Sequence, residues 1–466
     1  MAHQITNYDG GVVTSPQQLV YAETVEQIQA ILRDTDRFPS PVRAMGSFHS
    51  LTPCPSSSGT IVNMSRMNRI LDINLQEMTI TAQAGLQLID ASRALRTAKL
   101  QFMTNIEIGN ITLGSAACCQ TKDALDGVEH GQVNSYVTRI KWVDPSGELQ
   151  EAAEELLYLV RSSYGLCGIV YEVTFKLKPL EGIRFTYLPR EVDQLTEEEV
   201  SRIIAGSEGL ICWTLGRTTV FQSRNRTTTV NPLTRWIADV RRFSWSFSVA
   251  FVGRFLQSCP PTAALKKLLL NGWFALLKGL YRLLNSIGGF TLYGPDKTVD
   301  YRATPPSARY AFTFWAFPRN QWLNTLKAYL EFSEAHFQKY GFRCNMPLGS
   351  YFIRQDQSSI LSYSHDGDIF SIDPIHAYEA ADRAAWDFFL TEFNRWASQR
   401  DGIPLLNQSP FLNRRQVESA YGTRWERFRS RERGRFTPID AAPNATLKFL
   451  HLAGLSCGLG SHKRAM

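Results

Sequence analysis

Several signatures that would place this chain in a known chemical class are missing from it. Its eight cysteines form no C-x-x-C pair, so their spacing does not predict a zinc site. Although the formal net charge is +7, no tract of lysine and arginine is dense enough to predict a nucleic-acid groove. No G-x-G-x-x-G follows a predicted strand, which argues against a Rossmann dinucleotide site. We therefore expect neither a metal nor a nucleic acid as partner.

Two further absences bear on the compartment. The first residues, MAHQITNYDGGVV, lack the charged region and apolar run of a secretory signal. Cys118 and Cys119 are adjacent in the chain and poorly placed to form a disulfide with each other. Together these features favour a reducing compartment, and we expect a cytoplasmic protein.

What the chain does have is a high aromatic content and a change of character near its first third. Phe, Trp and Tyr make up 12% of the 466 residues, which suits a protein that encloses a flat organic molecule or one with a large core. Up to Pro179 short β-branched runs alternate with helical spacing, and after it longer helical patterns appear. The length and this shift predict an α+β protein of two domains.

The segment 244–292 is the most apolar part of the sequence. Within it, residues 264–285 place leucines along one helical face and lysine, arginine and asparagine along the other. Charge interrupts the pattern too often for a helix that spans a bilayer. The segment is typical of a peripheral membrane contact, of a homodimer interface, or of a helix packed on its own domain.

Five blocks in register carry a resemblance to a known family. They are VRAMGSFHSLTPCPSSSGTIVNMSRMNRILDINLQEMTITAQAGLQLID from residue 42, NITLGSAACCQT (110–121), EHGQVNSYVTRIKWVDPSGEL (129–149), RSSYGLCGIVYEVTFKLKP (161–179) and VESAYGTRWERFRSRERGRFTP (417–438). These blocks resemble the flavin domain of the vanillyl-alcohol oxidase superfamily, and among its members the aldonolactone and alditol oxidases.

The resemblance implies a fold and a domain order. It implies a PCMH-type FAD-binding domain of two α/β subdomains, and an α+β substrate (cap) domain built on an antiparallel sheet. On this chain the FAD-binding domain is expected at 1–180, the cap domain at 181–399, and a return to the first domain at 400–466. The boundary near 180 coincides with the composition shift.

The same resemblance assigns the residues that contact FAD. In the turn GSFHS, Gly46 allows close approach of the backbone, so that its N–H groups cradle the pyrophosphate. Small residues in the second block let the chain pass close to the flavin. The expected cofactor-binding residues are Arg43, Gly46, Ser47, Phe48, His49, Ser50, Asn110, Thr112, Gly114, Ser115, Cys118, Thr121, Ile169, Val170 and Asn407. Ile169 and Val170 are expected to contact the adenine through their backbone.

His49 is expected to do more than bind. In the family, the histidine of this turn often carries FAD covalently through the 8α-methyl carbon of the flavin, and we expect the same bond here. The alternative is a loop histidine without such a bond. Cys118 and Cys119 are interpreted as small buried residues and not as redox cysteines.

Two hallmarks of sugar oxidation are missing. No Glu-x-Arg pair precedes the LS at 361–362, and LLNQ (405–408) stands where the family has H-W-x-K. Gln408 brings no positive charge to the flavin, unless Arg354 or Arg414 supplies it. A lactone needs a buried base and several polar partners, so we expect a less polar substrate.

Four residues are candidates for catalysis: Glu107, Tyr351, Arg354 and Gln408. Glu107 lies where the family controls access of oxygen, and its carboxylate could take a proton, hinder oxygen, or simply face solvent or pair with a cation. His365 is a weaker candidate base.

The sequence thus predicts an FAD-dependent oxidase that accepts hydride at flavin N5 from a small molecule with a C–OH or C–N group, and passes electrons to O₂. A dehydrogenase, or an oxidative cyclase or desaturase of a specialised metabolite with another acceptor, is the alternative. A binding protein on the same fold is the third reading, because the base and lysine are missing.

Overall fold

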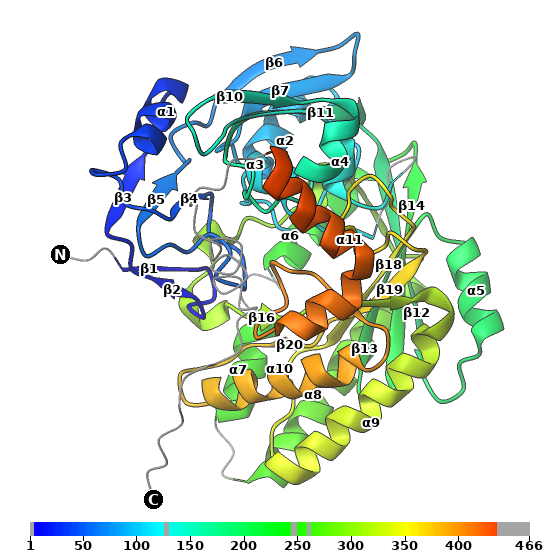
Figure 1. The fold of residues 1–466 in the computed structure, drawn as a ribbon. Helices are drawn as coiled ribbons and strands as arrows, with labels where there is room; N and C mark the ends of the chain where they lie inside the picture. Colours follow the sequence, from blue (N-terminus) through cyan, green and yellow to red (C-terminus); the bar gives the residue numbers. More distant parts are fainter. Residues whose placement is uncertain (1–3, 125–129, 244–248, 259–261, 436–466) are drawn as a thin grey trace, which may run out of the picture.

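The computed structural model describes residues 4–124, 130–243, 249–258 and 262–435. Parts of the segment 244–292 and the end of the block 417–438 lie outside these ranges. In Figure 1 the first two sheets occupy the upper part of the view, and the large third sheet lies below them beside α8, α9 and α10.

A three-stranded parallel sheet begins the fold. Its order is β3 (Gln18–Tyr21), β5 (Thr60–Asn63), β4 (Val42–Met45). The helix α1 (Val25–Arg33) covers it, because Ile28, Ile31 and Leu32 recur on one face and are buried. Thr24 caps the start of the helix, since its side chain accepts a hydrogen bond from the Gln27 N–H at 3.3 Å.

The second sheet is antiparallel. Its order is β10 (Leu149–Ala152), β9 (Val137–Val143), β11 (Ile169–Pro179), β7 (Thr79–Gln83), β6 (Ile70–Asn74), and β8 (Leu100–Phe102) also pairs with β11. Packed against it are α2 (Leu88–Thr97) and α3 (Leu113–Cys118). The alternation in residues 59–85 predicts two strands, but the structure has three. β5 is the central strand of the first sheet and only β6 and β7 form the predicted hairpin.

The third sheet is antiparallel and has eight strands. Their order is β15 (Phe290–Tyr293), β12 (Gly182–Glu191), β14 (Thr218–Thr227), β13 (Gly209–Leu215), β18 (Leu348–Ile353), β19 (Ile369–Ile372), β17 (Trp315–Pro318) and β21 (Ile403–Pro404). β11 of the second sheet ends at Pro179, and β12 of the third sheet begins at Gly182. The chain thus passes from one sheet to the other where the composition of the sequence changes. The predicted return at residue 400 is not reflected in the strands, because β21 still pairs with β17.

Both faces of the third sheet are covered. Every residue of β13 is buried, and alternate side chains enter two different cores. Leu210 and Cys212 pack with α9 (Trp322–Tyr340) and α10 (Arg383–Ser398) in one core. Ile211 and Trp213 belong to the other core, together with Phe274 of α8.

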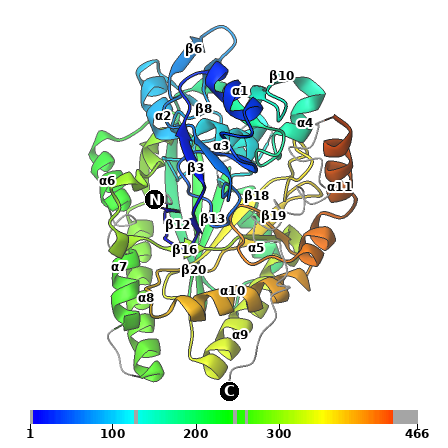
Figure 2. The ribbon, with the colours of Figure 1, turned by 60° about the vertical axis from the view of Figure 1, so that its left-hand side comes forward.

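The remaining helices lie around this sheet. Figure 2 shows α6 (Arg235–Phe243), α7 (Val249–Ser258) and α8 (Ala263–Ser286) along one side of the molecule. α8 has the predicted extent and packs on β12. α5 (Glu197–Ala205) begins at Thr196, and α11 (Arg414–Arg435) contacts α10 and β21. Short elements complete the chain: β1 (Ile5–Thr6), β2 (Val13–Thr14), α4 (Leu157–Val160), β16 (Ala311–Phe312) and β20 (Ile375–His376).

Candidate functional site

One large cavity lies between the first two sheets and the third. The space within it, including the part open to solvent, is about 1760 Å³. Four parts of the chain line it from the cofactor side: the turn after β4, the segment 111–121, the segment 164–170, and Asn407 with Gln408. The predicted cofactor-binding segments therefore meet in one place.

The turn GSFHS forms the first wall, directly after β4. A Cβ on Gly46 would come within 2.3 Å of Thr112 Oγ1, so only glycine fits there. Phe48 adopts a positive φ of 53°, which turns the chain sharply. Among the described residues, none accepts a hydrogen bond from the backbone N–H of Ser47, His49 or Ser50. The turn therefore offers unbonded donors to the cavity, as a pyrophosphate cradle requires.

His49, the fourth residue of this turn, is partly buried. Its ring stacks on Tyr8, with centroids 5.0 Å apart, and its Nε2 is hydrogen-bonded to the side-chain amide of Asn110. Burial, with the nearby positive charge of Arg309, lowers the pKa of His49 to about 4. The imidazole is therefore neutral at pH 7, and its Nε2 lone pair accepts the hydrogen bond from the Asn110 amide, which a covalent bond at this nitrogen would replace.

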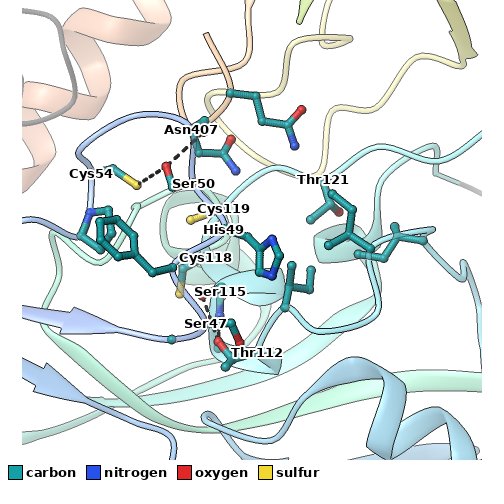
Figure 3. Close-up of a pocket in the computed structure, with 18 of the residues that line it drawn as sticks. Ser47, His49, Ser50, Cys54, Thr112, Ser115, Cys118, Cys119, Thr121 and Asn407 are labelled. Carbon is teal, nitrogen blue, oxygen red and sulfur yellow. Dashed lines mark hydrogen bonds between the residues drawn. The ribbon is translucent and has the colours of Figure 1, made fainter. Parts of the chain in front are cut away.

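The second wall is the short helix α3. Thr112 caps it, and the Thr112 hydroxyl donates to Ser115 Oγ at 2.9 Å (Figure 3). A Cβ on Gly114 would lie 2.8 Å from that of Ala84, so the helix sits close on β7. Burial raises the pKa of the Cys118 thiol to about 12. Cys118 is thus an unreactive buried thiol, in agreement with its interpretation as a small residue.

Arg43 connects the turn GSFHS to the segment 164–170, which forms the third wall of the cavity. Its guanidinium donates to the carbonyl oxygens of Cys54 at 2.9 Å, Tyr164 at 2.8 Å and Gly165 at 3.3 Å. Val170 lines the cavity, whereas the side chain of Ile169 is buried in the core behind it. A backbone contact of Ile169 with adenine stays a prediction.

The C-terminal part of the chain closes the cavity against the turn. The Asn407 carbonyl accepts hydrogen bonds from the Leu51 N–H and the Ser50 hydroxyl, both at 3.0 Å (Figure 3). The Thr52 hydroxyl donates to the Leu406 carbonyl at 3.1 Å. Residues more than 350 positions apart thus form one wall.

Several polar atoms at this cavity are buried without a hydrogen-bond partner among the described residues. They include Thr121 Oγ1, Asn407 Oδ1 and Gln408 Oε1. A buried polar atom without a partner costs free energy, so native proteins rarely leave one unless a ligand or water satisfies it. These atoms point to a polar ligand in the cavity.

The third sheet supplies the opposite wall, which is mostly aromatic. Lys122 stands among its rings, with Nζ 4.6 Å from the centroids of both Phe314 and Tyr351. The same Nζ is 2.5 Å from Asp373 Oδ2. Burial raises the pKa of Asp373 to about 6, and burial lowers the pKa of Lys122. The pair is the polar feature of an otherwise apolar surface.

Glu107 lines the cavity but belongs to an ion cluster beneath it. Arg224, which is fully buried, donates to Glu107 at 2.6 Å and to Asp123 at 3.1 Å. Lys297 is also fully buried and pairs with Asp123. The positive charges of Arg224 and Lys297 thus balance the negative charges of the two carboxylates. Of the alternatives for Glu107, the structure shows the ion-paired one.

Removing one member of this cluster should cost stability. We expect Lys297→Met to lower the free energy of unfolding by about 3–5 kcal/mol, because Asp123 would keep a buried charge with one partner fewer. Burial lowers the pKa of Lys297 to about 8, so the side chain is still mainly charged at pH 7. The measurement is the shift of the urea unfolding transition.

The control is Arg202→Met, because Arg202 pairs with Glu198 on the exposed surface of α5. An exposed pair contributes about 0–1 kcal/mol, so this variant should unfold almost as the parent does. Equal transitions for both variants would contradict the importance of the buried cluster.

Arg354 is not brought to the cavity. β18 ends at Ile353, and along this strand Tyr351 faces the cavity while Phe352 enters the core on the other side. Arg354 has the parity of Phe352 and lies beyond the strand, where it is exposed. The catalytic role predicted for Arg354 is therefore not supported by its position, whereas Tyr351 and Gln408 line the cavity as predicted.

Sequence reasoning missed the charged residues on the third-sheet side of the cavity. The available signal was that two charged residues, Lys122 and Asp123, directly follow the small-residue segment 110–121. For Asp373 and Arg224 no local pattern distinguishes them from surface charges, which is where such residues are normally found.

Comparison with known proteins agrees with this geometry. Residues 16–153 match the family model of an FAD binding domain. L-gulonolactone oxidase of Scyliorhinus torazame is 23% identical over 199 residues, 42% of this chain and 45% of that protein. A putative D-arabinono-1,4-lactone oxidase of Neurospora crassa is 26% identical over 182 residues, 38% of this chain and 32% of that protein. The chain thus spans less than half the length of these relatives.

The whole fold also has a solved counterpart. A cholesterol oxidase from B. sterolicum superimposes with a TM-score of 0.73 at 14% identity, over 97% of both chains. The α+β fold with a PCMH-type FAD-binding domain and an antiparallel cap sheet is confirmed, as is the resemblance to the vanillyl-alcohol oxidase superfamily.

Proposed function

We propose that this chain is an FAD-dependent oxidoreductase that oxidises a small molecule and passes the electrons to O₂. One observation carries the proposal. The cavity joins the segments of the FAD binding domain, on one side, to an aromatic wall that holds the ion pair of Lys122 and Asp373, on the other.

The residues present fit FAD. The unbonded N–H groups of the turn 46–50 suit a pyrophosphate, and the absent Cβ of Gly46 leaves room beside Thr112. Thr121, Asn407 and Gln408 hold polar atoms that have no partner among the described residues and could form hydrogen bonds with a flavin ring. When bound, FAD supplies a hydride acceptor at N5 and a route for two electrons to O₂, which yields peroxide.

Asp373 is the group that accepts the proton of the substrate. Its carboxylate is buried, lines the cavity, and has the pKa of about 6 that suits a base near neutral pH. Loss of hydride from carbon and of the O–H or N–H proton to Asp373 leaves the substrate as a carbonyl or imine. Lys122 holds the carboxylate in place by their ion pair.

The same wall indicates the substrate class. Apart from Lys122 and Asp373, the third sheet and its connections present aromatic and aliphatic side chains to the cavity: Trp213, Tyr301, Tyr310, Phe312, Tyr351 and Ile375. Such a surface binds an apolar body and recognises one polar group. The substrate is an alcohol or amine with an apolar skeleton, less polar than a sugar lactone.

The test of this function is a substrate screen with two readouts. Purified chain should carry flavin, and alcohols or amines with apolar skeletons should bleach it without air. In air each turnover should consume one O₂ and release one peroxide. A chain that neither retains FAD nor binds it on reconstitution would contradict the proposal.

The rate should depend on pH in a defined direction. Because burial raises the pKa of Asp373 to about 6, its carboxylate forms only above that pH. We expect kcat/KM to rise with pH through about 6 and then to level off. The measurement is flavin reduction under single-turnover conditions. A profile that is flat through this range, with flavin still bound, would count against Asp373 as base.

A dehydrogenase, or an oxidative cyclase or desaturase, is the second candidate, and Glu107 favours it. Its carboxylate lines the cavity where the family controls access of oxygen, and a charge there could keep oxygen away from the flavin. Reduced protein that reoxidises slowly in air but quickly with a quinone would select this alternative.

A further inference from the structure

Exposed apolar side chains gather on α6, α7 and α8. Of the twenty large hydrophobic side chains that are exposed among the described residues, twelve lie on or just after these three helices: Trp236, Val240, Phe243, Phe251, Phe255, Leu265, Leu268, Leu269, Leu276, Leu280, Leu283 and Ile287. We call this the α6–α8 face. Soluble proteins rarely expose apolar side chains in such a group without a partner for them.

The spacing shows that each helix presents a stripe. On α8, Leu276, Leu280 and Leu283 are 65%, 49% and 59% exposed, at intervals of four and three residues. The opposite stripe of the same helix, with Leu270, Phe274 and Leu277, is buried on the third sheet. α8 thus has two apolar faces, and the protein's own core uses one of them.

α6 and α7 continue the pattern. Trp236, Val240 and Phe243 recur at intervals of four and three residues on α6, and Phe251 and Phe255 are four apart on α7. α7 packs on α8, and Figure 2 shows all three helices on one side of the molecule. The stripes therefore belong to one side of the protein.

The charge of the segment 235–287 favours a lipid surface over a second copy of the chain as the partner of this face. From Arg235 to Ile287 the sequence has one acidic residue, Asp239, against eight basic ones: Arg235, Arg241, Arg242, Arg254, Lys266, Lys267, Lys278 and Arg282. Its net charge of +7 equals that of the whole chain. In a symmetric dimer this segment would face itself and like charges would repel. An anionic lipid surface would attract it and would also take up the apolar stripes.

We propose that the α6–α8 face docks the protein peripherally on an anionic lipid surface, with the helices lying in the plane of the interface. Among the described residues no helix is both long and apolar enough to cross a bilayer, so the contact is superficial. The helices of the α6–α8 face and the aromatic wall of the cavity lie on the same side of the third sheet. Trp213, which lines the cavity, and Phe274 of α8 belong to one core. This proposal does not depend on the proposed function.

The test is flotation of the full chain with vesicles of phosphatidylcholine alone and of phosphatidylcholine with phosphatidylserine. We expect binding to the anionic vesicles, weakened by salt because part of it is electrostatic. The double variant Leu276→Glu with Leu283→Glu should lower the partition coefficient at least about tenfold, because it places charge in the apolar stripe. Both side chains point outward, so an unchanged thermal midpoint checks the fold.

The control carries the same change on another exposed surface. Leu71 and Leu75 lie on and after β6 and are also exposed, and their replacement by glutamate should leave vesicle binding unchanged. Equal binding to neutral and anionic vesicles, or equal loss in both double variants, would overturn the proposal. Absence of vesicle binding together with a dimer in sedimentation would also overturn it and assign the face to a second copy.

Discussion

Replacing Asp373 by asparagine is expected to lower kcat by about 10²–10⁴-fold, the contribution typical of a positioned general base. The amide has nearly the same shape as the carboxylate but cannot accept the substrate's proton. Because Asp373 is buried and paired with Lys122, the variant also leaves that ammonium without its carboxylate. The measurement is the rate of flavin reduction in a single turnover, with the flavin content of the variant as a check on folding.

A fall in rate could also follow from a loosened structure, and the control addresses this. Asp356 is an equally buried carboxylate that accepts hydrogen bonds from Ser135 and the Ser358 N–H, and it does not line the cavity. Asp356→Asn should reduce flavin at nearly the parental rate. Asp373→Glu should keep a rise of rate with pH, whereas Asp373→Asn should lose it. A variant Asp373→Asn with the parental rate and pH profile would remove Asp373 from the mechanism.

Replacing His49 by alanine is expected to abolish covalent attachment of FAD. We expect the denatured parental chain to carry the mass of one FAD on the peptide that contains His49, and the variant to carry none. The reason is that His49 is a neutral imidazole at pH 7, with its pKa near 4, and its ring stands beside the unbonded N–H groups of the turn. A neutral ring nitrogen can bond to the electron-poor 8α carbon.

The measurement is the intact mass of the denatured chain, followed by peptide mapping. His365→Ala is a suitable control, because His365 contacts Tyr158 and Asp366 and does not line the cavity. A parental chain that is yellow when native but unmodified when denatured would rule out the bond while leaving FAD as the cofactor. The same increment in His49→Ala would place the attachment on another residue.

Local signals in the sequence were sufficient for much of the fold. Thr24 and Thr196 begin helices because their side chains accept the first free N–H groups. Gly341 ends α9 because it adopts a positive φ of 72°. The turn GSFHS was recognisable from its own five residues, which resemble the flavin-binding turn of the family. Each of these features is determined by neighbours within a few residues.

Features that depend on distant partners could not be read in this way. Residues 59–74 alternate as one strand, yet β5 joins a parallel sheet and β6 another, and only the pairing partners decide this. Lys122 is buried because Asp373, 251 positions later, neutralises it. Arg354 was a candidate because it lies close to the place of the missing Glu-x-Arg pair, but it is an odd number of positions from Tyr351, and such a spacing leads to the opposite face of a strand.

The contact between the turn at Ser50 and the carbonyl of Asn407 has a consequence for biosynthesis. The ribosome releases Ser50 long before Asn407, so a nascent chain has the cradle but not the wall that closes it. Closing a loop of more than 350 residues is a late event in folding, because it brings together residues that are far apart in the chain. We therefore expect FAD to bind after translation, and chains truncated before residue 407 to fold in part but stay colourless.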